Sequence, residues 1–321
     1  MKDPEIHISF EILKLIAEID QFKGQWHTMG QLVPAKLQTL IKISIVESIG
    51  SSLRLAGINC TDRQIGKLQS GLELTPDSLD RQTIKAIIGY QKVINLIHKS
   101  FLKITLLPNH INQLYSMIFT LPPGRAEALQ PQKAAALKEL IRWTNASLQD
   151  DKIHPLLLIV TFAMRFHDIS PFKEGNGRMA RVLTTLLLLR CGYIYTTYSS
   201  IEHVIEQHRD EYRALQKLSA LTFNEKSRLT EWISFFLHAL KEHKDTLTQK
   251  IDREKIMVSL PDSSKEIIKI ISEQGQATIS QIQIISKANR NTLKIRLRKL
   301  VKDKYLLQQG RGKGTRYTVG I

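Results

Sequence analysis

Apolar residues recur three or four positions apart along most of this chain, and this spacing constrains the fold more than any other feature of the sequence. Clear examples lie at residues 10–22, 132–144, 155–166 and 229–244. Such spacing places the apolar side chains on one face of an α-helix, whereas a half-buried strand alternates with a period of two. Strict alternation appears only near the C-terminus. The sequence therefore predicts an all-α protein with a small hairpin close to its end.

The composition indicates a globular protein of two or three domains. Of its 321 residues 42% are hydrophobic, which is enough for a sizeable core. Cys60 and Cys191 offer neither a disulfide framework nor paired metal ligands, so we expect reduced thiols and a cytoplasmic location. The first residues carry acids and a proline where a secretory signal needs an apolar run. The apolar run at 182–189 is far shorter than the roughly 20 residues of a spanning helix, so we expect no membrane partner.

Positive charge is concentrated at the C-terminus. The whole chain has a net charge of +16, and residues 262–321 carry 13 Lys or Arg against 4 Asp or Glu, a net of +9. A dense basic field on a short segment favours a polyanionic partner, most commonly nucleic acid, although a solvated basic face is the alternative. Turn-forming residues at 259–262 interrupt the helical spacing, and we place a domain boundary there.

Residues 264–321 contain three helix candidates, at 265–273, 280–286 and 289–302, followed by a hairpin. In the third helix, four apolar residues share one face while Asn291, Lys294, Arg298 and Lys302 project from another. Asn and Arg side chains can form paired hydrogen bonds with base edges, and Lys mainly neutralises phosphate. This second face has the residues that a DNA recognition helix needs.

The segment resembles the winged helix-turn-helix domains of bacterial regulators, with the glycine-rich hairpin tip at 309–315 as the wing. The resemblance implies a DNA partner, contacted by Arg290 and the third-helix residues Asn291, Lys294 and Arg298, and by Arg311 and Lys313 from the wing. Many such domains bind protein instead. Because helix-turn-helix readers often pair on symmetric sites, we also expect a possible homodimer.

Residues 170–181, Ser-Pro-Phe-Lys-Glu-Gly-Asn-Gly-Arg-Met-Ala-Arg, carry the clearest chemical signal in the chain. A Gly175-Asn176-Gly177 turn that opens a helix presents free backbone N–H groups to an anion such as phosphate. Arg178 and Arg181, three residues apart, leave one helical face and can add two cations. Glu174 is placed to hold Mg²⁺ together with substrate phosphate.

This motif resembles the signature of the Fic family, His-Pro-Phe-x-Asp/Glu-Gly-Asn-Gly-Arg-x-x-Arg, and the likeness extends over about residues 40–235. It implies an all-α, Fic-type helical core that uses ATP and Mg²⁺ to transfer AMP to a Ser, Thr or Tyr hydroxyl of a protein substrate. Glu174 would hold Mg²⁺, residues 175–177 the phosphates, and Arg178 and Arg181 the developing charge. The expected domains are an N-terminal helical region at 1–100, a Fic core at 101–248, a linker at 249–261 and the winged helix-turn-helix at 262–321. Relatives place a target-clamping hairpin where this chain has residues 121–130.

Ser170 departs from the family pattern, because it stands where relatives carry a catalytic histidine that accepts the proton of the attacking hydroxyl. A serine is not a general base near neutral pH, and such a base typically contributes ~10²–10⁴-fold to the rate. His167, about one helical turn earlier, is a possible substitute or an ordinary half-exposed helix histidine.

A second departure concerns regulation. Many relatives carry an inhibitory helix with the pattern Ser/Thr-x-x-x-Glu-Gly/Asn, whose Glu pairs with the last motif arginine. Aligning Gly57 with the motif glycine puts Ser52 at the hydroxyl position and Ala56 at the Glu position. We therefore expect no inhibition of that type and an Arg181 that is free for nucleotide. A different alignment would make Glu47 the equivalent.

These observations leave three functions open. The chain is a Fic-type protein adenylyltransferase coupled to DNA binding, a DNA-binding regulator whose degenerate Fic domain senses nucleotide, or a protein that removes AMP with water activated by His167.

Overall fold

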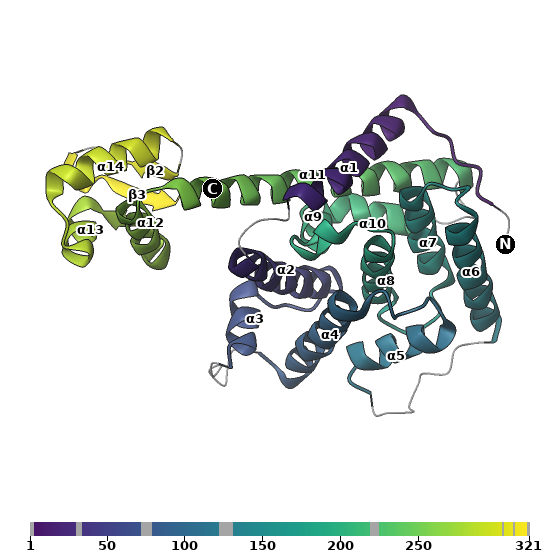
Figure 1. The fold of residues 1–321 in the computed structure, drawn as a ribbon. Helices are drawn as coiled ribbons and strands as arrows, with labels where there is room; N and C mark the ends of the chain where they lie inside the picture. The colour runs from purple at the N-terminus through teal and green to yellow at the C-terminus, as the bar shows by residue number, and fades with distance from the viewer. Residues whose placement is uncertain are drawn as a thin grey trace. The chain divides into compact units, whose positions relative to one another are not determined.

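The computed structural model describes residues 3–29, 34–71, 79–121, 131–218, 225–303, 305–310 and 312–319. Helices dominate these residues, and a three-stranded sheet is formed near the C-terminus, so the all-α prediction is confirmed. The chain divides into two compact units, Met1–Thr248 and Gln249–Ile321 (Figure 1). The division falls inside one helix, α11 (Glu225–Ser259), which also contains most of the predicted linker at 249–261. The predicted hairpin at 121–130 lies outside the described residues except for Leu121.

The first unit is built from helices, whose bounds are α1 (Phe10–Met29), α2 (Pro34–Leu55), α3 (Asp62–Gln69), α4 (Arg81–Ser100), α5 (Pro108–Ile118), α6 (Pro131–Asp150), α7 (Pro155–Ile169), α8 (Asn176–Arg190), η1 (Ile194–Thr197), α9 (Ile201–Gln207), α10 (Arg209–Lys217) and the start of α11. Among the described residues, no helix is both long enough and apolar enough to cross a lipid bilayer.

Helices α7 and α8 form the centre of this unit and lie side by side (Figure 1). Pro155 begins α7 at a position where its missing N–H costs nothing, and the His154 side chain accepts the N–H of Leu156. Residues 156–166 of α7 and 178–189 of α8 are all buried. Helix α8 also packs against α2 and α4, so three neighbouring helices hold it in place.

Helix α5 approaches α4 unusually closely. A Cβ atom on Gly89 of α4 would lie 2.1 Å from the carbonyl oxygen of Ile118, the last residue of α5. Only glycine allows this approach, and it fixes the position of Phe119, which follows α5 and reaches the candidate site.

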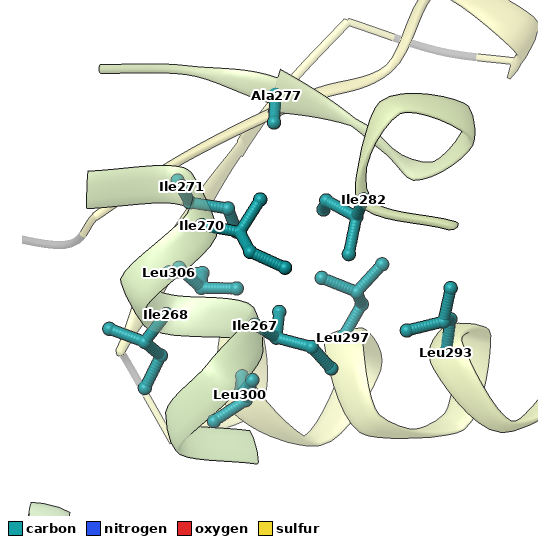
Figure 2. Close-up of a cluster of buried hydrophobic side chains, with 10 residues drawn as sticks. All are labelled: Ile267, Ile268, Ile270, Ile271, Ala277, Ile282, Leu293, Leu297, Leu300 and Leu306. Carbon is teal, nitrogen blue, oxygen red and sulfur yellow. The ribbon is translucent and has the colours of Figure 1, made fainter. Parts of the chain in front are cut away.

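The second unit has the order α12 (Asp262–Gln274), β1 (Ala277–Thr278), α13 (Ile279–Ser286), α14 (Arg290–Lys302), β2 (Leu306–Gln309), η2 (Gly312–Gly314) and β3 (Arg316–Val319). The three helices and the hairpin that the sequence predicts are therefore present. The sheet order is β1-β3-β2, with both pairs antiparallel. Isoleucines of α12 and leucines of α14 meet in one core, closed by Ala277, Ile282 and Leu306 (Figure 2).

Candidate functional site

The site lies in the loop between α7 and α8 and in the first turn of α8. Asn176 closes this loop with its side chain: its Oδ1 accepts the N–H of Phe172 at 2.9 Å and its Nδ2 donates to the carbonyl of Phe172 at 2.8 Å. The Phe172 ring is buried and stacks on Tyr115, with centroids 3.9 Å apart. These contacts anchor the loop to α5. The Asn176 side chain is occupied, so Asn176 can offer a ligand its main-chain N–H.

The first turn of α8 leaves backbone donors available. Gly175 is the N-terminal cap in a left-handed conformation, and in the described part of the chain no side chain caps the helix. The first backbone bond of the helix runs from Met179 to the carbonyl of Gly175, so the N–H groups of the three preceding residues have no acceptor within the helix. A Cβ on Gly175 would lie 2.3 Å from the ring of Phe119, so this residue must be glycine. The N-terminal end of α8 therefore presents backbone N–H groups and a partial positive charge.

Arg178 lies beside this helix end and is 9% exposed. Its guanidinium group stacks 4.3 Å above the ring of Phe119. Its Nε atom is buried without a hydrogen-bond partner among the described residues. Burial, and secondarily the charge of Arg181, lowers the pKa of Arg178. A buried cation with an unused donor favours an anionic ligand at this position.

Arg181 is buried and paired with a residue of α2. We expected it to be free for nucleotide, but its Nε donates to the Ser52 hydroxyl at 2.9 Å and its Nη2 donates to the Ser52 carbonyl at 2.8 Å. That carbonyl belongs to the last turn of α2, where the helix itself supplies few donors. We expected only a carboxylate to pair with Arg181. Ser52 supplies two neutral acceptors instead, its hydroxyl and its carbonyl.

Ala56 lies just beyond α2 and is exposed. The backbone N–H of Gly57 donates to the carbonyl of Arg54, and that of Ile58 donates to the carbonyl of Leu53. Gly57 has a φ of +85°, and this left-handed conformation ends the helix. The helix that resembles the inhibitory segment is therefore present and in contact with Arg181, through a residue one turn before Ala56.

A family model described as "Fic/DOC family" matches residues 108–188, from the start of α5 to the last turn of α8. This match includes every motif residue just described. The chain carries a Fic domain.

Solved structures of Fic proteins share the fold. A Fic family protein from Desulfovibrio desulfuricans G20 is 18% identical, with a TM-score of 0.62 over 99% of this chain and 98% of its own. A Fic domain containing signaling protein from Bacteroides thetaiotaomicron VPI-5482 is 16% identical, with a TM-score of 0.52 over 70% of this chain and 97% of its own. Fic-1 from C. elegans is 16% identical, with a TM-score of 0.56 over 73% of this chain and 71% of the solved fragment.

Ser170, at the histidine position of the Fic motif, caps the end of α7 in a left-handed conformation with a φ of 43°. Its Oγ donates to the carbonyl of His167 at 2.6 Å, and its own carbonyl accepts a hydrogen bond from Lys133. The hydroxyl proton is therefore engaged in a hydrogen bond to the backbone of α7, and Ser170 acts as a helix cap.

The His167 imidazole is half-buried near the end of α7. Burial is the main cause that lowers its pKa; the charges of Arg181 and Arg228 act in the same direction, and Asp168 opposes them. Asp168 is paired with the buried Arg228 of α11. His167 is thus kept neutral, the form in which an imidazole can accept a proton.

A buried polar network surrounds Glu202, and no sequence pattern indicated it. Glu202 of α9 is 1% exposed and accepts hydrogen bonds from the hydroxyls of Ser48 (2.6 Å), Tyr90 (3.3 Å) and Ser200 (3.2 Å). Burial and the Glu202 charge raise the pKa of Tyr90. The network joins α2, α4 and α9.

Glu174 precedes the helix end and is exposed. Among the described residues, no group of three or more His, Cys, Asp or Glu side chains could hold a metal by itself. A single exposed carboxylate beside an anion site fits a Mg²⁺ ion that is shared with substrate phosphates.

In the second unit, α14 exposes Arg290, Asn291, Lys294 and Arg298 and buries Leu293, Leu297 and Leu300. The two faces expected from the sequence are therefore distinct in the structure. Arg311 lies outside the described residues, as does the side chain of Lys313, whose backbone is in η2.

Proposed function

We propose that this protein is an adenylyltransferase that moves AMP from ATP to a Ser, Thr or Tyr hydroxyl of a protein, and that its second unit brings it to DNA. The observation that carries the first part is the end of α8, which no side chain of the described residues caps, beside the buried Nε of Arg178, which has no hydrogen-bond partner among those residues. A helix end with free N–H groups and two buried guanidinium groups within one turn suits a polyphosphate better than a neutral ligand.

Each motif residue has a role in this proposal. The N–H groups of Asn176, Gly177 and Arg178 hold phosphate oxygens, and Glu174 holds the Mg²⁺ ion, which neutralises charge on the phosphates. In the transfer, a target hydroxyl oxygen bonds to the α-phosphorus, the bond to the β-phosphate oxygen breaks, and pyrophosphate leaves. Arg178 stabilises the charge that develops on the phosphates. Arg181 joins it when a phosphate oxygen replaces Ser52 as its acceptor.

The proton of the target hydroxyl needs an acceptor. Ser170 is unsuited to this role because its Oγ already donates to the carbonyl of His167. His167 is neutral and lies within electrostatic reach of Arg181, so we assign the role of base to it. Transfer is expected to be slow compared with a protein that carries histidine at position 170.

The same observation on Ser170 favours a second candidate, a nucleotide sensor that no longer transfers AMP. The two are separated by measuring AMP transfer from ATP labelled at the α-phosphate, with the chain itself and a cell extract as acceptors. The Ser170→His variant is feasible because histidine tolerates the left-handed conformation of this position.

An adenylyltransferase gives measurable labelling that is lost in His167→Ala and rises ~10²–10⁴-fold in Ser170→His. A sensor gives labelling only in Ser170→His. The absence of labelling in both the unaltered chain and Ser170→His contradicts the transferase proposal. Release of AMP from a labelled product by water, if it requires His167, assigns hydrolytic removal of AMP instead.

For the second unit, we propose that α14 enters the major groove of DNA as the recognition helix of a winged helix-turn-helix. The order of three helices and a hairpin, the exposed Asn291, Lys294 and Arg298, and the net charge of +9 over residues 262–321 support it. Gel shifts on a duplex pool test this assignment. Lys294→Ala is expected to weaken binding uniformly across sequences and to reduce the salt slope by about 1, while Lys85→Ala, an exposed lysine of α4, leaves both unchanged. Equal binding by a chain that lacks 262–321 would contradict the proposal.

A further inference from the structure

One residue on the exposed face of α14 does not fit a simple basic surface. Ile295 is 68% exposed, although the helix already buries three leucines in the core of the second unit. Ile295 is not part of that core cluster (Figure 2). A β-branched side chain also lowers helix propensity relative to Lys, Gln or Ala at a solvent position. Neither helix formation nor core packing therefore accounts for isoleucine here.

The neighbours of Ile295 on the helix surface are polar. Asn291 lies one turn before it, Arg298 one turn after it and Lys302 two turns after it, and all three are exposed. These positions form one stripe opposite Leu293 and Leu297. Ile295 is thus an apolar centre in a row of side chains that donate hydrogen bonds or carry positive charge.

A partner for this stripe needs an apolar group set among acceptors and phosphates. The major groove of B-DNA meets this description, because the 5-methyl group of thymine is the apolar feature that its base edges present, beside the N7, O6 and O4 acceptors. RNA does not meet it, since its major groove is too deep and narrow for side chains to read.

We propose that Ile295 reads the 5-methyl group of a thymine, so that this protein selects duplexes with thymine at one fixed position of each site. The inference rests on the proposed DNA binding by α14. It assigns a sequence preference that the charges of the helix do not provide, because contacts to phosphate carry no base information.

The experiment begins with selection of a bound duplex from a random pool by the full chain. Each dT of that duplex is then replaced singly by dU, which removes only the methyl group, and Kd is measured by fluorescence anisotropy at fixed salt. At one position per site, dU is expected to weaken binding about fourfold, the value of one buried methyl group. The Ile295→Ala variant binds the dT and dU duplexes equally. Ile284→Ala, which alters an exposed isoleucine of α13, keeps the discrimination.

Several results would overturn the inference. If no dU replacement changes Kd, or if Ile295→Ala still discriminates, Ile295 does not read a methyl group, although DNA binding stands. If Ile295→Ala changes the sedimentation of the DNA-free protein, the residue belongs to an interface between copies of this chain. If selection yields no bound duplex at all, the proposed DNA binding itself fails.

Discussion

Replacing Ser52 by Ala tests whether helix α2 competes with nucleotide for Arg181. The substitution removes the hydroxyl that accepts from Arg181 Nε at 2.9 Å and keeps the carbonyl that accepts from Nη2. Both residues are buried, with Ser52 at 0% and Arg181 at 5% exposure. A hydrogen bond to a charged group contributes about 1.5–3 kcal/mol, so the ligand-free protein should lose about 2 kcal/mol of unfolding free energy. For a unit of this size Tm should fall by about 4–8 °C.

The same substitution should strengthen nucleotide binding. Once the hydroxyl is gone, Arg181 exchanges a weaker set of contacts for a phosphate oxygen, and affinity for Mg·ATP should rise. A tenfold gain corresponds to about 1.4 kcal/mol of additional ligand stabilisation. Differential scanning fluorimetry, with and without excess Mg·ATP, measures both effects in one assay.

Ser51→Ala is the matched control. Ser51 is the neighbouring residue, is also 0% exposed, and contacts Arg54 and His203 rather than Arg181. It should lower Tm without enlarging the shift that ATP produces. The reasoning is refuted if Ser52→Ala leaves Tm unchanged, or if its ATP-induced shift equals that of Ser51→Ala.

Three further predictions concern the loop and one half-buried histidine. Gly175→Ala should lower stability by more than about 1 kcal/mol and weaken ATP binding, because its Cβ would clash with Phe119 and its φ of +72° disfavours a side chain; calorimetry and thermal melts check both. Asn176→Ala should cost about 2 kcal/mol in thermal unfolding, and Asn176→Asp about half of that, because Asp keeps the acceptor for the Phe172 N–H and loses the donor to its carbonyl. Burial lowers the pKa of His98 to about 4, so this residue favours folding above pH 6.5 and the gain is lost as pH falls from 6.5 towards 4. The loss should be about 2 kcal/mol at pH 5, measured by urea unfolding, and it should be smaller in His98→Gln.

Local sequence patterns predicted most of the secondary structure and the position of the loop. The three- and four-residue spacing located the principal helices, and the Gly-Asn-Gly turn located the start of α8, because both depend on residues close together in the chain. The capping of α13 by Thr278 is local in the same sense, since its hydroxyl accepts the N–H of Gln281 three residues later.

Contacts between distant segments were not predictable in the same way. Phe119 reaches Arg178 and the position of Gly175 because Gly89 lets α5 approach α4, and no local pattern indicates that approach. The partner of Arg181 was missed because a serine hydroxyl and a backbone carbonyl leave no charge pattern in the sequence. Glu202 accepts hydrogen bonds from three hydroxyls. Two of them come from other helices and the third from the N-cap of its own helix.

Titration calorimetry with Mg²⁺ and millimolar ATP, ADP and AMP tests most directly whether the first turn of α8 binds a nucleotide. We predict saturable binding of at least one of the three ligands at one site per chain. We also predict that binding is weakened at least tenfold in Arg178→Ala and unchanged in Lys85→Ala. The absence of heat with all three ligands in the folded protein, or binding that Arg178→Ala leaves intact, would contradict the account.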